Sequence, residues 1–167
     1  QAFLNYKAKP WLNLQAGLML IPMGIVNEYH EPTTFNGVER PMINNVIIPT
    51  TWREIGAGVA GNISDIGLRY QLYAVNGPLG YDDGPKLSGR KPIRGARQKG
   101  SQVTVSDFDL SGRLTYYGIK GLNFGFSGYF GQTESSLFNN LNQDSTMLSR
   151  QADSSSIGIN MISSDFR

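Results

Sequence analysis

The sequence contains no cysteine, only one histidine and comparatively few charged residues. The absence of cysteine excludes a disulfide framework and a thiolate zinc site. Charged residues make up 17% of the chain, against a usual share of roughly 25%. The net charge of +2 gives no reason to expect a nucleic-acid partner. The longest apolar stretch, residues 17–26, is interrupted by Pro22 and is much shorter than the run of about 18 that a membrane helix needs.

The chain instead contains segments in which apolar and polar side chains alternate with period two, the pattern of a β-strand with two different faces. The clearest segments are residues 11–23, 52–61, 65–76, 107–117 and 121–132, and weaker ones are 2–6 and 155–163. In the last segment the predicted apolar row is Ile157, Ile159 and Met161. The sequence therefore predicts an all-β, antiparallel fold of about seven strands.

The connections between these segments alternate between short and long. Short connections fall near residues 7–10, 62–64 and 118–120, and long ones at 24–51, 77–106 and 133–154. Transmembrane β-barrels have this rhythm, because tight periplasmic turns alternate with long outer loops. We therefore expect residues 1–167 to form part of an outer-membrane β-barrel whose three long loops lie outside the cell.

The second face of each predicted strand is rich in Asn, Gln, Ser, Thr, Gly and Tyr, which suits a water-filled lumen. A sheet in lipid must close on itself, because every backbone polar group there needs a partner. Seven strands are too few for a porin channel, so we expect the chain to be a fragment of a larger barrel.

The face of the strand on which a residue falls, and its place along the strand, select two sets of candidate residues. The lumen set consists of Glu54, Arg69, Asp109 and Arg113. The candidates for aromatic girdles at the membrane interfaces are Trp11, Trp52, Tyr70, Tyr116 and Phe130. For this second set, ordinary strand propensity of aromatic residues is the alternative explanation.

Loop 77–106 carries a cluster of cations in which Arg94, Arg97 and Lys99 are the candidates for selectivity. Rings of Arg and Lys select anions in channels. Two alternatives stay open: the loop could bind phosphates of lipopolysaccharide, or it could simply be solvated. The sequence does not decide whether the loop folds into the pore.

No arrangement of residues indicates an enzyme, a cofactor site or a metal site. Residues 56–61 match the G-x-G-x-x-G pattern, but a second strand follows them in place of the helix that would bind a dinucleotide. Glu28, His30 and Glu31 are better explained as a polar loop than as metal ligands.

Four short segments resemble the phosphate-selective porin O and P family and related outer-membrane porin-like proteins of Bacteroidota. They are residues 17–24 (GLMLIPMG), 27–32 (NEYHEP), 49–54 (PTTWRE) and 93–100 (IRGARQKG). The resemblance implies a barrel of about sixteen strands, often a homotrimer, that passes small solutes. Phosphate selectivity does not follow from it, because the family's arginine ladder cannot be aligned here residue by residue.

The function expected from the sequence is a porin that passes small hydrophilic solutes, anionic or neutral, through the bacterial outer membrane. The expected partners are outer-membrane lipid and lipopolysaccharide, and nucleic acid is not expected. The alternative is a non-conducting outer-membrane barrel that serves as a structural or secretion-complex component and binds partners with its long loops. An outer-membrane enzyme or a soluble β-sandwich is the third hypothesis.

Overall fold

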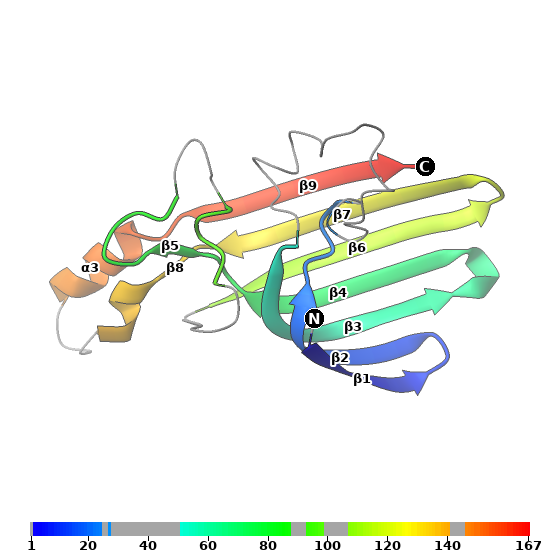
Figure 1. The fold of residues 1–167 in the computed structure, drawn as a ribbon, viewed down its shortest axis with the longest axis horizontal. Coiled ribbons are helices and arrows are strands. Elements are labelled where there is room, and N and C mark those ends of the chain that lie inside the picture. The colour runs from blue at the N-terminus through cyan, green and yellow to red at the C-terminus, as the bar shows by residue number, and fades with distance from the viewer. Residues whose placement is uncertain (1, 25–26, 28–50, 88–92, 99–106, 141–145) are drawn as a thin grey trace.

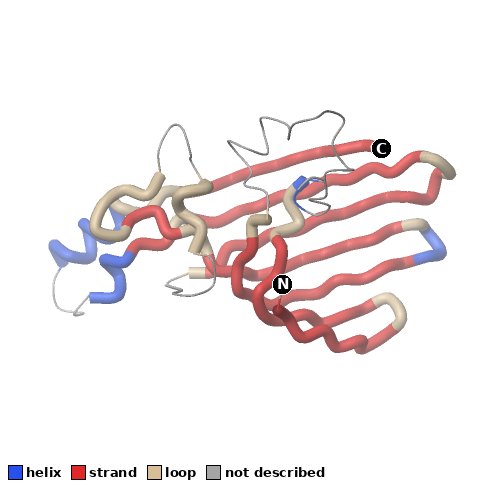
Figure 2. Tube along the Cα trace, in the orientation of Figure 1, coloured by secondary structure: helices blue, strands red, loops and turns tan. Residues whose placement is uncertain are grey.

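A computed structural model describes residues 2–24, 27, 51–87, 93–98, 107–140 and 146–167 (Figure 1). The predicted all-β class is confirmed: strands run along most of the described chain (Figure 2). The strands of the main sheet are β1 (Ala2–Lys9), β2 (Leu12–Leu20), β3 (Arg53–Ile63), β4 (Leu68–Asn76), β6 (Phe108–Ile119), β7 (Leu122–Gln132) and β9 (Gly158–Phe166). No helix among the described residues is long and apolar enough to cross a membrane.

These seven strands form one sheet in the order β1-β2-β3-β4-β6-β7-β9, and every neighbouring pair is antiparallel. Tight turns join β1 to β2, β3 to β4 and β6 to β7 at one end of the sheet, and the long connections leave from the other end (Figure 1). We call this second end the long-loop end. It carries a parallel pair, β5 (Leu79–Tyr81) with β8 (Glu134–Ser135), the 3-10 helix η3 (Ser136–Asn140) and the helix α3 (Thr146–Ser154).

Glycine closes the turn between β3 and β4. The short 3-10 helix η2 (Ser64–Ile66) ends at Gly67, whose φ of 63° lies in the left-handed region and whose N–H donates to Ser64 O. That conformation is costly for residues with a Cβ. Tight closure at this point keeps β3 and β4 in register over eight residue pairs.

The sheet has two chemically different faces, because residues directly opposite one another in neighbouring strands share a face. One row of opposed residues is Leu14, Val59, Leu72, Gly112, Gly128 and Ile162, and we call its side the apolar face. Another row is Gln15, Gly58, Tyr73, Ser111 and Tyr129, and we call its side the polar face.

The apolar face is open. Leu72, Leu114 and Phe126 are 54%, 50% and 54% exposed in the middle of the sheet. Soluble monomers rarely leave contiguous apolar patches larger than a few hundred Å² uncovered. The polar face, in contrast, is covered near the long-loop end, where it holds the buried core formed by Met19, Ile21, Met23, Trp52, Ala60, Tyr73, Val75, Ile93 and Tyr129. The distribution is the reverse of that in a soluble sheet, where the aliphatic face is the covered one.

Two predictions about the strands are wrong in detail. The predicted strand 11–23 is too long: β2 ends at Leu20, and residues 21–24 continue as a separate segment. The predicted apolar row of the last strand has the wrong parity, since Ile159 and Met161 lie opposite Gly131 and Tyr129 and so belong to the polar face. The exposed apolar residues of β9 are Ile162 and Phe166. Ile159 and Met161 pack against the buried core on the polar face, which explains why these two apolar residues lie on that face.

Candidate functional site: the polar face

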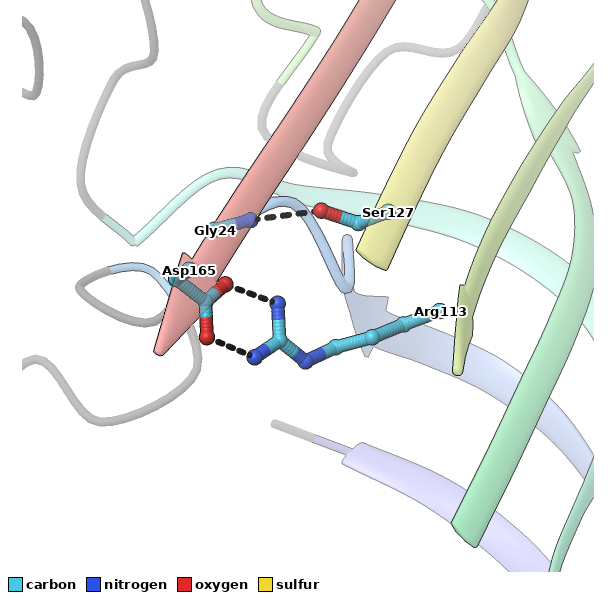
Figure 3. A network of polar contacts seen from close by, with 4 residues as sticks. All are labelled: Gly24, Arg113, Ser127 and Asp165. Carbon is cyan, nitrogen blue, oxygen red and sulfur yellow. Dashed lines mark hydrogen bonds and ion pairs between the residues drawn. The ribbon is translucent and has the colours of Figure 1, made fainter. Parts of the chain in front are cut away.

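Residues 21–24 cross the polar face from β2 to β7. We call them the inward segment. Gly24 N donates to Ser127 Oγ at 3.2 Å, although β3, β4 and β6 lie between the two strands in the sheet (Figure 3). All four residues of the inward segment are buried. Part of the polar face is therefore occupied by the chain itself.

A buried asparagine fixes the start of the inward segment. Asn27 Oδ1 accepts a hydrogen bond from Trp52 N at 2.9 Å, and Asn27 Nδ2 donates to Ile21 O at 2.6 Å. Ile21 N in turn donates to Trp52 O at 3.0 Å. These bonds tie both sides of the first long connection together at the point where it leaves the sheet.

Glu54 is fully buried on the polar face and both of its carboxylate oxygens are hydrogen-bonded. Trp52 Nε1 donates to Oε1 and Asn76 Nδ2 donates to Oε2, each at 2.9 Å. The Trp52 ring also lies 4.7 Å from the ring of Tyr129, centroid to centroid. The prediction that Trp52 belongs to an aromatic girdle is therefore wrong: Trp52 is 0% exposed, because it has the parity of Glu54 and faces inward.

Asp109 is held in a similar way at the start of β6. Tyr129 donates its hydroxyl hydrogen to Oδ2 at 2.6 Å, and Gln132 N donates to Oδ1 at 2.9 Å. Gly131 lies opposite Asp109, and a Cβ there would overlap the carboxylate. The two acidic residues of the predicted lumen set share a face as predicted, but both are buried in hydrogen-bonded networks.

Arg113 forms a bidentate ion pair with Asp165. Nη1 donates to Oδ2 at 2.8 Å and Nη2 donates to Oδ1 at 2.7 Å (Figure 3). The pair joins β6 to β9 across β7, where Gly125 leaves room for it, since a Cβ on Gly125 would overlap both partners. The sequence did not identify Asp165, because the predicted strand ended at residue 163. The available signal was the alternation continuing to Phe166.

The remaining cationic candidates lie toward the two ends of the sheet. Arg69 is exposed on the polar face near the tight turns, opposite Asn62 and Thr115. At the long-loop end Arg94 is exposed and Arg97 is half-buried. Burial lowers the pKa of Arg97, Arg94 lowers this pKa further, and Glu54 raises it. The third loop candidate, Lys99, lies outside the described residues.

The other four girdle candidates lie at the ends of the sheet. Tyr70 and Tyr116 belong to the apolar face near the tight turns, and Phe130 belongs to it near the long-loop end. Tyr70 donates its hydroxyl hydrogen to the backbone oxygen of Trp11 at 2.9 Å. Trp11 is 45% exposed in the turn between β1 and β2.

The glycines of residues 56–61 leave room for side chains of the neighbouring strand. A Cβ on Gly56 or Gly58 would overlap Val75 or Tyr73, the neighbours across the polar face, and one on Gly61 would overlap Tyr70 on the apolar face. The three-residue 3-10 helix η2 and then strand β4 follow these glycines, in place of the α-helix that the dinucleotide-binding pattern needs. Within the part of the chain that the structure describes, no group of three acidic, histidine or cysteine residues is placed to hold a metal ion. Glu28, His30 and Glu31 lie outside that part.

Fold and site together define an antiparallel β protein whose polar face is partly covered and whose apolar face is open. The chain is 38% identical over 128 residues to an uncharacterized protein of Aquifex aeolicus (strain VF5). The match covers 77% of this chain but spans only 28% of the length of that relative. No protein-family model matches the chain, and no solved structure matches it significantly. The resemblance to the phosphate-selective porins stays a prediction.

Proposed function

We propose that the chain is part of a transmembrane β-barrel of a bacterial outer membrane that passes small hydrophilic solutes by diffusion. The observation that carries the proposal is the distribution of side chains over the two faces of the sheet. Rows of exposed Leu and Phe cover one face, and the buried ionic and hydrogen-bonded groups lie on the other. Lipid is the surrounding that makes such an exposed face favourable, because it removes the apolar side chains from water.

The ends of the sheet support the same proposal. All tight turns lie at one end and all long connections at the other, as in outer-membrane barrels. Strands β1 and β9 are the two edges of the sheet. In lipid both edges need partners, so the proposal requires further strands that close the barrel. The relative, of which this chain spans 28%, is long enough to supply them.

Conductance tests the proposal. We expect the full-length protein to insert into planar lipid bilayers and to give stepwise, ohmic currents in simple salt solutions. A protein that stays monodisperse in buffer without detergent would refute the membrane assignment. A protein that inserts but gives no current would refute the pore.

We further propose that the pore favours anions, because Arg94 brings an exposed positive charge to the long-loop end, where solutes enter. Within the sheet, the charge of Arg113 is balanced by Asp165. Arg94→Gln is expected to lower the anion-to-cation permeability ratio, measured as the reversal potential in a salt gradient.

Lys86→Gln is the matched control for this measurement, because it removes one cation from the same long connection, where Lys86 pairs with Asp82 at 3.2 Å. It leaves Arg94 in place. We expect a smaller shift of the reversal potential than Arg94→Gln gives. Equal shifts would mean that the position of Arg94 has no importance for selectivity.

One observation favours the alternative, a barrel that does not conduct freely. The inward segment and the core beneath it fill part of the polar face at the long-loop end. If they block the lumen, the variant Ser127→Ala, which removes the hydrogen bond from Gly24 N, should conduct where the native protein does not. Native currents as large as those of the variant would remove this alternative.

A further inference from the structure

A pocket of about 320 Å³ lies at the long-loop end of the apolar face. The described residues that line it are Leu18, Thr51, Arg53 and Arg97. Leu18 and Arg53 stand in the apolar face, since Leu18 lies opposite Ile55 and Arg53 lies opposite Leu20. The pocket therefore combines two guanidinium groups and a hydroxyl group with an aliphatic wall, at the border between the apolar face and the loops.

Arg97 is held in place by its neighbours. Ala96 O accepts a hydrogen bond from Leu79 N at 2.6 Å, and Gln98 Nε2 donates to Gly77 O at 2.8 Å. Both Ala96 and Gln98 are buried. The backbone on either side of Arg97 is thus anchored, so binding through its guanidinium group costs less ordering entropy than binding through a free loop.

Both charged residues among the described lining are arginines. Burial lowers the pKa of Arg97, Arg94 lowers this pKa further, Glu54 raises it and Arg53 lowers it again, so Arg53 lies close enough to act on the Arg97 guanidinium group. An anion between Arg53 and Arg97 would be attracted by both guanidinium groups. Thr51 adds a second sign of a binding site: its φ of 63° is a left-handed conformation that β-branched residues rarely adopt. Such strained residues cluster where ligands bind.

We propose that Thr51, Arg53 and Arg97 bind the phosphate group of a phosphorylated lipid headgroup, with Leu18 against the start of an acyl chain. Guanidinium groups bind phosphate through paired, charge-assisted hydrogen bonds. The proposal rests on the proposed function, because insertion into the membrane brings lipid to the apolar face. Long loops of outer-membrane barrels face the outside, so the lipid is one of the outer leaflet, such as the phosphorylated glycolipid part of lipopolysaccharide.

Binding of lipid A tests this site. Full-length protein in a non-ionic detergent is mixed with lipid A that carries its phosphates or with lipid A from which they have been removed, and the two dissociation constants are compared. We expect the phosphorylated form to bind about tenfold more tightly. The double variant Arg53→Gln, Arg97→Gln should lose this preference. Arg150→Gln, which removes an exposed arginine of α3, should keep it.

Equal binding of the two lipids, or an unchanged preference in the double variant, would overturn the proposal. Inorganic phosphate at constant ionic strength separates a lipid site from a site for free anions. We expect it to displace lipid A no better than chloride does, and selective displacement at millimolar concentration would overturn the lipid assignment. Circular dichroism shows whether the double variant is folded. A protein that is soluble without detergent would instead refute the proposed function, whatever lipid it binds.

Discussion

Asn27→Ala is predicted to release the inward segment from the polar face while the sheet stays folded. The buried Asn27 side chain accepts a hydrogen bond from Trp52 N and donates one to Ile21 O. Its loss leaves the buried Trp52 N–H unsatisfied, at about 1–3 kcal/mol, and removes a hydrogen bond to Ile21 O worth about 0.5–1.5 kcal/mol, although Ile21 O keeps the bond from Met23 N. The docked state therefore loses about 1.5–4.5 kcal/mol. Because about 1.4 kcal/mol corresponds to a factor of ten, local opening becomes roughly 10-fold to 1,600-fold more frequent.

Hydrogen exchange of the full-length protein in detergent measures this opening. The amides to follow are those of Ile21 and Met23, which donate to Trp52 O at 3.0 Å and to Ile21 O at 2.7 Å. Their exchange should accelerate in Asn27→Ala, whereas amides in the centre of β6 should exchange as before. Asn27→Asp keeps the acceptor for Trp52 N and should have a smaller effect. Unchanged exchange at residues 21–23, or an equal acceleration throughout the sheet, would refute the reasoning.

Three further substitutions test the networks of the polar face through the free energy of unfolding, measured by urea titration in lipid vesicles. Asp165→Asn leaves the Arg113 guanidinium buried without its counter-charge, and we expect a loss of about 3–5 kcal/mol; an unchanged midpoint would contradict this role of the ion pair. A Val side chain at position 125 would overlap the same ion pair, so Gly125→Val should lower the free energy of unfolding by a similar amount. The double variant with Asp165→Asn should lose little more, and strictly additive losses would contradict a shared cause. Trp52→Phe removes the donor to Glu54 Oε1 and should cost about 1–3 kcal/mol, and a variant as stable as the native protein would show that this hydrogen bond has no net value.

The sheet could be predicted because its signal is local. Alternation depends on adjacent residues, so segments such as 107–117 and 121–132 are visible without knowledge of their partners. The same parity rule placed Glu54, Arg69, Asp109 and Arg113 on one face, as their register now shows. The same rule could also have corrected the girdle prediction for Trp52, because Trp52 stands two residues from Glu54 and therefore faces the same way.

The contacts across the sheet could not be predicted, because no local pattern encodes them. Arg113 and Asp165 are 52 residues apart and lie on strands separated by β7. Gly24 and Ser127 are 103 residues apart. The inward segment is apolar like the end of β2, so the sequence does not mark where the strand ends. Only Pro22, which lacks a backbone N–H for the ladder, indicates the change.

Two pairs of adjacent residues in mid-sheet offer the most direct test of the membrane assignment, the central claim. Residues 1–167 contain no cysteine. Gln71→Cys, Leu72→Cys, Leu114→Cys and Thr115→Cys therefore each give a single site for a fluorescent label, once any cysteine elsewhere in the full-length protein has been replaced by Ser. In vesicles, we predict that brominated lipid quenches the labels at positions 72 and 114, while aqueous iodide quenches those at 71 and 115. Labels at 72 and 114 that are shielded from lipid, or that iodide quenches as strongly as their neighbours, would contradict a sheet with one face in lipid and the other in water.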